Sequence, residues 1–174
     1  MTIPFERTTC DCPSCAAGCR TMPGSLIPGD VEKILATLPV EVDRWAWFTE
    51  HFAASEGSVI QYIDPEKGMV QERVPTIVPR QNANGECYFL TETGRCAIHA
   101  VSPYGCAYHD THMSEADGYA RSHYAVMQQR DRATPAGVHY AIYWAALKEL
   151  GNVVASLLER RTAFQQAVEA IEDK

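Results

Sequence analysis

Residues 87–112 read CYFLTETGRCAIHAVSPYGCAYHDTH and hold three of the seven cysteines of this chain. The other four cysteines lie in TTCDCPSCAAGC, which spans residues 8–19. Thiolates that are close in sequence can converge on one soft cation or iron–sulfur cluster at a small cost in loop-closure entropy. The two cysteine groups therefore predict a fold that brings residues 8–19 and 87–112 together around metal.

The composition predicts one globular domain over residues 1–174. The chain is 46% hydrophobic and 21% charged, which is enough for a sizeable core but leaves little room for a second full domain. The net charge is −7 and no basic stripe alternates with aromatic residues, which argues against nucleic acid or an anionic membrane surface as a partner. The N-terminus lacks a signal-peptide pattern, and no run reaches the roughly 20 apolar residues of a membrane span. We expect a cytoplasmic protein with no membrane or nucleic-acid partner.

The odd number of cysteines and the expected reducing compartment favour metal binding over disulfide formation. A redox dithiol at Cys12 and Cys15 is the alternative, but such a motif normally follows a buried strand and opens a helix. Here it lies in TTCDCPSCAAGCRTMPG, which has the composition of a loop. We expect residues 1–29 to form an irregular, Cys-rich loop that metal keeps ordered.

Two short helices and a hairpin are predicted between the two cysteine groups. Asp30 is the expected N-cap of a helix over residues 31–38, and a second helix is expected over residues 41–55. The runs SVIQYID and VQERVPTIVPR then flank a Pro-Glu-Lys-Gly turn and are rich in β-branched residues, as in a small hairpin. Pro75 and Pro79 favour an edge strand for the second run, because proline cannot donate a ladder hydrogen bond.

The C-terminal third is predicted to be helical from Val138 to Ile171, either continuous or broken at Gly151-Asn152. Apolar residues recur there at three- and four-residue steps and form a wide face of Val138, Ile142, Ala145, Leu147, Leu150, Val154, Leu157 and Leu158. This face packs either on the cysteine region or on a second copy of the chain, which would make a homodimer. The predicted fold class is α+β and mostly helical, with a Cys-rich loop (1–29), a cysteine-cluster core with irregular metal-binding loops (30–112) and a helical part (113–174).

The second cysteine group predicts a hairpin in which Cys87 and Cys96 stand at neighbouring strand ends across Thr93-Gly94. The same group resembles the YkgJ-like cysteine-cluster family, which is described as zinc- or iron-chelating domains or as Fe–S-cluster-containing proteins. That family follows the patterns C-x-F-L, G-x-C-x-I-[YH] and P-x-x-C. The matching positions here are Cys87, Phe89, Leu90, Gly94, Cys96, Ile98, His99, Pro103 and Cys106.

The first half of that family carries C-x-x-C-x-x-C-C before an apolar stretch, an Asp and a helix. Cys12, Cys15 and Cys19 match this order, and Gly18 stands where the first of the paired cysteines would be, with Cys10 as a substitute ligand. A serine also replaces the Arg that usually precedes the proline. The resemblance covers both cysteine groups and implies metal binding without naming a reaction.

Closed zinc sites and common iron–sulfur clusters each use about four protein ligands. Seven thiolates exceed one such site and fall one short of two. Either four thiolates form one site while three thiolates and an imidazole form another, or a thiol stays free beside a single site. His99 is the histidine that the family resemblance aligns with this role, and His109 and His112 are its neighbours. The predicted metal ligands are Cys10, Cys12, Cys15, Cys19, Cys87, Cys96, Cys106 and His99.

The stretch HDTH offers the catalytic candidates His109, Asp110 and His112, because an imidazole–carboxylate corner beside a thiolate site can hold a metal or transfer protons. No phosphate loop, nucleotide fingerprint or hydrolase elbow names a substrate. We expect an iron–sulfur protein with a redox or enzymatic role, of the oxidoreductase type or a modification enzyme, acting on a small molecule or a protein. The alternatives are a structural zinc module that acts through protein contacts and a soft-metal handling protein.

Overall fold

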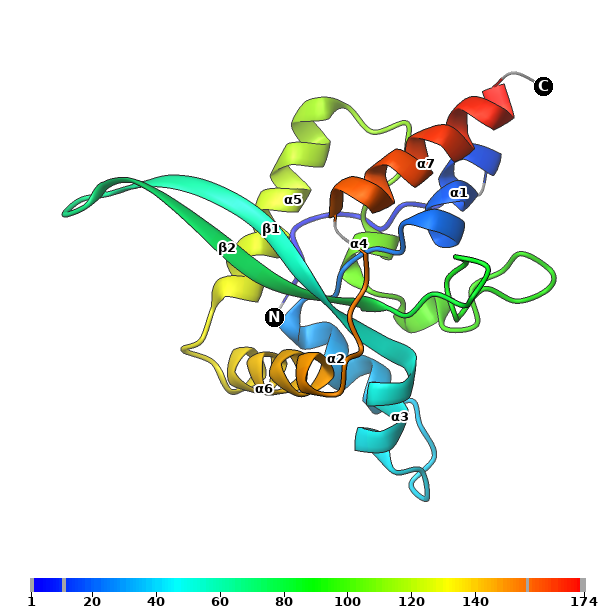
Figure 1. Cartoon of the computed structure of the whole chain (residues 1–174), viewed down its shortest axis with the longest axis horizontal. Helices are drawn as coiled ribbons and strands as arrows, with labels where there is room; N and C mark the ends of the chain where they lie inside the picture. The colour runs from blue at the N-terminus through cyan, green and yellow to red at the C-terminus, as the bar shows by residue number, and fades with distance from the viewer. Residues whose placement is uncertain (1, 11, 156, 173–174) are drawn as a thin grey trace.

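The computed structural model describes residues 2–10, 12–155 and 157–172 (Figure 1). Its elements are α1 (Pro13–Thr21), α2 (Pro28–Leu35), α3 (Arg44–His51), β1 (Phe52–Asp64), β2 (Gly68–Pro79), the 3-10 turn η1 (His99–Val101), α4 (Tyr104–Ala107), α5 (Glu115–Arg130), α6 (Pro135–Glu149) and α7 (Leu157–Glu172). The predicted α+β class with mostly helical content is confirmed. Within the described ranges, no helix is both long and apolar enough to cross a membrane.

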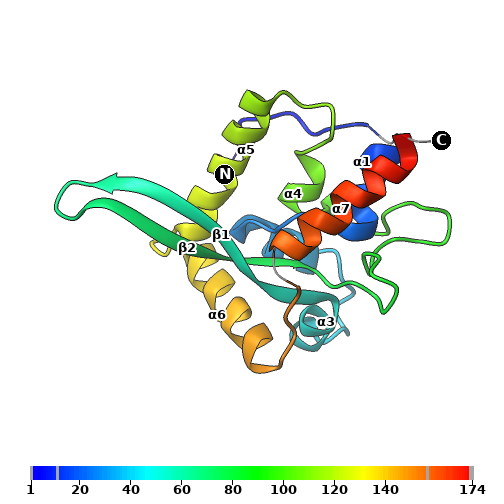
Figure 2. The ribbon, with the colours of Figure 1, turned by 45° about the horizontal axis from the view of Figure 1, so that its top comes forward.

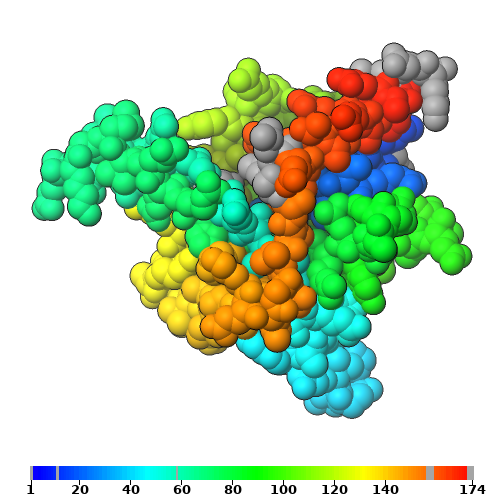
Figure 3. Space-filling model, viewed as in Figure 1, coloured from blue at the N-terminus to red at the C-terminus, as the bar shows by residue number. Residues whose placement is uncertain are grey.

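The hairpin of β1 and β2 forms the long arm of the molecule. The strands pair antiparallel from Phe52 opposite Pro79 to Asp64 opposite Gly68. Their inner half lies among the helices, and their outer half projects away from the body (Figures 2 and 3). The predicted hairpin is confirmed, although both strands are longer than the sequence pattern indicated.

The second predicted helix ends at His51 instead of Ser55, which corrects its C-terminal boundary. Asp43 caps the start of α3, since its Oδ1 accepts the backbone N–H groups of Trp45 at 3.0 Å and of the next residue at 3.1 Å. From Phe52 onward the chain pairs with β2. Pairing with β2 and burial in the core override the helical pattern of the residues after α3.

Pro75 lies in β2 at an irregularity of the sheet. On the facing strand the register shifts between Ser55 and Ser58, and Gly57 adopts a φ of +84°. A bulge leaves a residue without a ladder partner, so the missing N–H of proline is tolerated at this position. Proline in this run therefore marks a bulge within a long strand.

Asp30 connects α2 to α4 and is not the N-cap that the sequence predicted. The helix begins at Pro28, with Ile27 as its N-cap. Asp30 Oδ2 accepts the N–H of Ile27 at 3.0 Å and the N–H of Tyr104 at 2.7 Å. One carboxylate oxygen thus holds the segment that carries Cys106 against the start of α2.

The expectation of an irregular loop over residues 1–29 is wrong for α1. Cys12 is the N-cap of this helix and Pro13 occupies its first position, where the fixed φ of proline suits a helix. The helix packs against α7, and Ala17 in its middle is buried. Patterning missed it because the helix has only nine residues and its one buried residue is an alanine.

The C-terminal helical pattern divides into α6 and α7 at Gly151, so the broken form of the prediction is the correct one. Gly151 has a φ of +74°, a left-handed conformation that glycine adopts at low cost after a helix. Val153 then pairs with Ala54 of β1. The segment between the two helices is thereby fixed to the hairpin.

The core face of α6 differs in part from the predicted apolar face. Tyr140 and Leu147 are fully buried. The exposed apolar residues of this segment are Val138, Ile142 and Leu150. The side chains of Leu157 and Leu158 lie outside the described part of the structure, and a homodimer through this segment stays a prediction.

The main core lies between α2, α3, α6 and the inner half of the hairpin. Phe48 and Phe52 are fully buried, and their rings stack with centroids 4.5 Å apart. Cys87 and Phe89 belong to the same core. The second cysteine group thus begins within the main core, and Cys96 packs against it.

Burial raises the pKa of Asp30 to about 6, although its two N–H donors act in the opposite direction. Because folding raises this pKa above its ordinary value of 3.8, the folded chain binds the Asp30 proton more tightly than the unfolded chain does. The stability from this group is fully present below that ordinary value and is lost as the pH rises through about 6. Asp30→Asn keeps an oxygen acceptor and removes the buried charge, so we expect unchanged or higher stability at about pH 8 and a flatter stability profile between about pH 4 and pH 7.

Asp30→Ala is the contrasting variant, because it leaves the N–H groups of Ile27 and Tyr104 unpaired and should cost about 2–4 kcal/mol. Urea unfolding across this pH range measures both effects. A pH dependence of the Asn variant identical to that of the wild type would contradict the assignment.

Candidate functional site

Four potential metal ligands gather at the N-terminal end of α1. The thiols of Cys10, Cys12 and Cys15 and the imidazole of His112 each offer one ligand atom, and these atoms all lie within 4.8 Å of one another. A tetrahedral zinc site with Zn–S bonds of about 2.3 Å would set its ligand atoms about 3.8 Å apart. This group, here called the exposed set, has the composition and spacing of a site that can hold a metal ion.

α1 positions two of the three thiols of the exposed set. Cys12 is the N-cap, and its Sγ accepts the backbone N–H of Cys15 at 3.5 Å. Three residues make almost one turn of helix, so the two side chains return to the same side. The C-x-x-C motif is therefore a helix N-terminus that presents two sulfur atoms in one direction.

His112 comes from the loop between α4 and α5, 100 residues after Cys12. Its Nε2 lies 3.1 Å from the Sγ of Cys12, and Thr111 Oγ1 lies 3.2 Å from the Sγ of Cys15. Asp110 Oδ1 accepts the backbone N–H of His112 at 2.9 Å. The HDTH stretch thus supplies an imidazole to the exposed set and a carboxylate that shapes its loop.

The contacts within the exposed set favour a thiolate at Cys12. The backbone N–H of Cys15 and the side chain of His112 lower the pKa of Cys12 to about 6. The same contact raises the pKa of His112. For Cys10, the N–H of Cys12 lowers the pKa, but hydrogen bonds with the neighbouring thiols raise it to about 11. A thiolate is the form of cysteine that binds metal, and this set holds one near neutral pH.

The remaining four cysteines form a second group, here called the shielded set. Its members are Cys19, Cys87, Cys96 and Cys106, all of them free thiols. Burial raises the pKa of each thiol, that of Cys87 to about 12, and electrostatic repulsion acts within every pair of the four. A cation among them would reverse this penalty, because its charge favours the thiolate form.

Two copies of one backbone turn hold two cysteines of the shielded set. The first turn covers residues 80–90 and the second covers residues 89–99, so the offset is nine residues. Each has a glycine at positive φ two positions before its cysteine, Gly85 at +84° and Gly94 at +76°. In the first turn, Asn82 N donates to Glu86 O and Tyr88 N donates to Arg80 O. The equivalent hydrogen bonds of the second turn run from Thr91 N to Arg95 O and from Ala97 N to Phe89 O. An antiparallel bridge closes each turn, between Gln81 and Cys87 and between Leu90 and Cys96.

Backbone N–H groups point at the sulfur atoms of both turns. The N–H groups of Phe89 and Leu90 lower the pKa of Cys87, against the larger effect of burial, and the N–H of Ile98 acts in the same way on Cys96. A neutral thiol is a weak acceptor, whereas an ionised acceptor makes shorter and stronger hydrogen bonds. Donors of this kind are also what tunes the potential of a thiolate-ligated cluster. The turns are thus suited to sulfur in its charged, metal-binding form.

Cys106 reaches the shielded set because two glycine backbones cross. Gly105 donates its N–H to Ser25 O at 2.8 Å, and Gly24 donates its N–H to Cys106 Sγ at 3.1 Å. A Cβ on Gly24 would lie well under 3.0 Å from the backbone of Gly105 and Cys106. The absence of a side chain on Gly24 is therefore a condition for the position of this thiol.

α1 joins the two sets. Cys15 of the exposed set and Cys19 of the shielded set are four residues apart, so they lie on one face of the helix and their thiols interact. The carbonyl of Cys19 accepts the N–H of Cys87 at 3.0 Å. Arg20 pairs with Glu86 of the first turn at 2.5 Å. The helix is thus fixed to the second cysteine group by backbone and side-chain contacts together.

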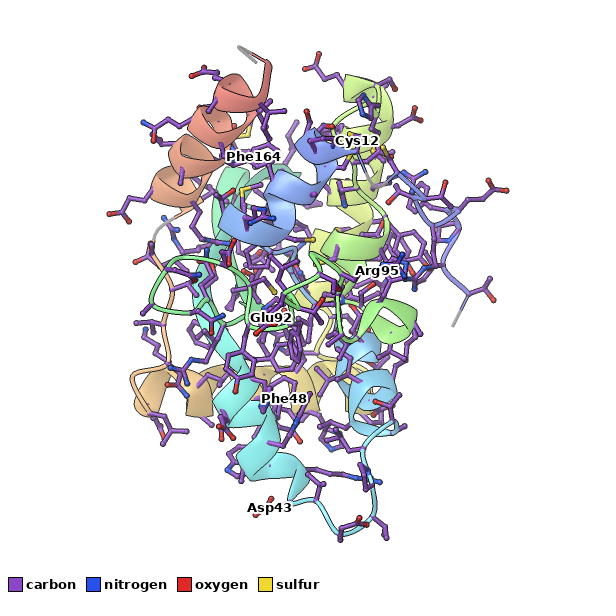
Figure 4. The ribbon with its side chains drawn as sticks, turned by 90° about the vertical axis from the view of Figure 1, so that its right-hand side faces the viewer. Cys12, Asp43, Phe48, Glu92, Arg95 and Phe164 are labelled. Carbon is purple, nitrogen blue, oxygen red and sulfur yellow. The ribbon has the colours of Figure 1, made fainter. Side chains whose placement is uncertain are left out.

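Figure 4 shows α1 beside α7, with Phe164 projecting from α7 toward α1. Cys12 lies at the outer end of α1. The loop that carries Glu92 and Arg95 lies between α1 and the core residue Phe48 in this view. The exposed set thus occupies the end of the molecule, and the cysteine turns lie between it and the core.

Comparisons with protein-family models, with curated proteins and with solved structures found no match. The ligands are therefore assigned from their geometry. His112, and not His99, lies with the thiols of the exposed set. His99 is exposed on η1, where its carbonyl accepts a hydrogen bond from Arg7 at 2.7 Å. His109 faces α5, with its Nε2 3.2 Å from Ser122 Oγ.

Two features of the site differ from the sequence predictions. The expected hairpin across Thr93-Gly94 is instead a pair of successive turns, each with its own cysteine. The repeated pattern G-x-C-x followed by an apolar residue, at residues 85–89 and 94–98, is the signal that reveals this repeat. The C-x-x-C motif opens a helix after all, although irregular chain precedes it where a redox dithiol would follow a strand.

Gly24→Ala tests the crossing that places Cys106. The new methyl group has to displace the backbone of residues 105 and 106, so we expect a loss of about 1–3 kcal/mol in stability. If the shielded set holds metal, we also expect the variant to lose at least half of that metal. Gly29→Ala is the matched control, because a Cβ there meets nothing within 4 Å and lies in a helix. Thermal unfolding measures the stability of both variants, and metal analysis measures their metal content. Equal metal content in the two variants would contradict the role given to Gly24.

Proposed function

We propose that this protein is a metal protein with two centres, one in the exposed set and one in the shielded set. One observation carries the proposal: Cys10, Cys12, Cys15 and His112 gather as four potential ligands, and the remaining four thiols are close enough to one another to interact electrostatically. Four ligands are what closed zinc sites and common iron–sulfur clusters require. The sequence count of seven thiolates is completed to eight ligands by His112.

The shielded set supports an iron–sulfur cluster best. All four of its ligands are thiolates, which such clusters prefer, and backbone N–H groups are directed at Cys87, Cys96 and Cys106. Cys87 is buried in the main core and Cys96 packs against it, whereas Cys19 and Cys106 are half-buried. A cluster held in this way supplies one-electron chemistry, and we propose a redox or enzymatic role for the protein. The resemblance to YkgJ-like proteins supports metal binding by the same cysteines.

The exposed set supports a single soft ion such as zinc, because its ligand atoms already lie within 4.8 Å of one another. Cys10 and His112 are exposed, so this centre is open to exchange or to a partner molecule. Cys12 and Cys15 would be its fixed ligands, since the helix N-terminus holds them. Asp110 would orient the loop of the imidazole ligand through the N–H of His112.

A structural zinc module is the second candidate, and α1 is the observation that favours it. The helix has nine residues and contains Gly18, and isolated helices of that length are marginal in water. Metal bound through Cys12, Cys15 and Cys19 would supply the order that the short helix lacks. In this case both centres hold zinc and the protein acts through its surface.

Elemental analysis with acid-labile sulfide and an absorption spectrum, on protein purified without oxygen, distinguishes the two. Iron with matching sulfide and a visible absorption band that dithionite bleaches supports the iron–sulfur centre. Two zinc ions per chain and no colour support the structural module. One metal ion per chain contradicts the two-centre proposal.

Single substitutions should remove the centres separately. Cys12→Ser and His112→Ala are expected to lower only the metal of the exposed set, and Cys96→Ser only that of the shielded set, because each leaves one incomplete ligand shell. His99→Ala is the matched control and should keep the full metal content, since His99 is exposed and is not among the four ligands of the exposed set. Metal content per chain is the measurement. Loss of metal in the His99 variant equal to that in the His112 variant would refute the assignment of the imidazole.

A further inference from the structure

A cavity of about 410 Å³ lies beside the exposed set, and Cys10 and His112 form part of its lining. This volume is in the range of pockets that hold small molecules, about 300–1,000 Å³. The N-terminal segment forms one wall, and the loop after α4 with the start of α5 forms the other. A molecule in this cavity would touch the exposed set directly.

Two arginines, both half-buried, line the cavity. Arg7 donates through Nη2 to the carbonyl of His99 at 2.7 Å and to the hydroxyl of Ser102 at 3.0 Å. Arg121 donates through Nη1 to the carbonyls of Glu6 at 2.8 Å and Tyr108 at 3.2 Å. Each guanidinium has five N–H groups, so most of its donors are not used by these anchors. Because the anchors already fix both side chains, they would lose little freedom on binding a ligand.

The guanidinium of Arg121 also carries an unpaired donor, its Nε. It is buried, and it has no hydrogen-bond partner in the part of the chain that the structure describes. Buried polar groups are nearly always paired, and exceptions call for an explanation such as a missing ligand. The Arg121 guanidinium also lies over the ring of Phe5, 5.0 Å from its centroid, which holds its plane in place.

Carboxylates line the same cavity. Asp110 is half-buried, and Glu6 and Asp117 are exposed. Among the described residues, neither these three nor Arg7 and Arg121 belong to an ion pair within 4.0 Å. Charges placed only to stabilise the fold would be expected to pair across so small a space. Instead, the two guanidinium groups donate to backbone carbonyls, Asp110 accepts a backbone N–H, and Asp117 accepts the hydroxyl of Ser114. These hydrogen bonds keep the cationic and anionic side chains apart.

We infer that this cavity binds a small zwitterion of the amino-acid type, with its carboxylate on Arg7 and Arg121 and its ammonium group toward Asp110 and Asp117. Guanidinium groups match a carboxylate in a bidentate manner, and an ammonium group brings three donors that carboxylates accept. Three thiolates around a divalent cation keep one negative charge, so the exposed set also favours a ligand with an ammonium group over a simple anion. The inference rests on the proposed exposed centre, to which the cavity gives a ligand.

The test begins with thermal-shift measurements on the metal-loaded protein with each of the twenty common amino acids, followed by calorimetric titration with the one that binds best. Its deaminated carboxylic acid and its decarboxylated amine are the matched probes. We expect at least one amino acid to bind and each matched probe to bind at least tenfold more weakly, because each lacks one of the two charged groups.

Variants identify the groups that bind. Arg121→Gln should weaken binding at least tenfold, and Arg121→Lys should recover part of it by restoring the charge without the bidentate geometry. Arg130→Gln is the matched control, because this guanidinium pairs with Glu72 of the hairpin at 3.0 Å and does not line the cavity. Circular dichroism and metal analysis on every sample report the fold and the state of the centres. If Arg121→Gln does not fold, Asp117→Asn tests the site instead. We expect this variant to weaken amino-acid binding at least tenfold, because it removes an acceptor of the ammonium group.

Each outcome separates this inference from the proposed function. Fully metal-loaded protein that binds none of the amino acids would overturn the inference and leave the two centres standing. Equal binding of the carboxylic acid that lacks the amine would overturn the assignment of a zwitterion. An amino acid bound by protein that takes no metal at the exposed set would support the cavity site and contradict the exposed centre.

Discussion

Cys15 and Cys19 stand one helical turn apart on α1, and this spacing links the two ligand sets. A helix of nine residues has little stability of its own, so α1 depends on what its cysteines and its contacts with α7 supply. The sets in turn depend on α1, because each takes at least one thiol from it or from its N-cap. The helix and the sets therefore depend on each other, and metal bound as proposed would couple the order of the N-terminal region to these sets.

The two sets differ in their surroundings, and the difference has a structural origin. The shielded set is built from two backbone turns that grow directly from the core beside Phe89, with Cys106 added through the crossing of Gly24 and Gly105. The exposed set is built from a helix N-terminus and a polar loop. Burial raises the pKa of every thiol in the first, whereas N–H and imidazole contacts lower that of Cys12 in the second. Shielded sulfur suits a permanent cofactor, and exposed sulfur suits exchange.

Much of the fold follows from sequence patterns with a clear physical cause. The β-branched runs around a Pro-Glu-Lys-Gly turn predicted the hairpin, and Gly151-Asn152 marked the break between α6 and α7 as one of two alternatives. α1 was missed because its only buried residue is an alanine, and the end of α3 was misplaced because the burial of Phe52 overrides helical periodicity. All seven cysteines were predicted as ligands. Their division into two sets, and the choice of His112 over His99, depend on tertiary contacts 100 residues apart that no local pattern records.

The hairpin arm has a consequence for how the chain is held together. Its tip, around residues 64–68, separates the first four cysteines from all the other ligands. Each set therefore draws ligands from both sides of the tip: Cys12 and His112 in one, Cys19 and Cys87 in the other. A nick in this projecting ribbon would leave two fragments with a shared core and two shared ligand sets. Metal bound at either set would then hold the two fragments together.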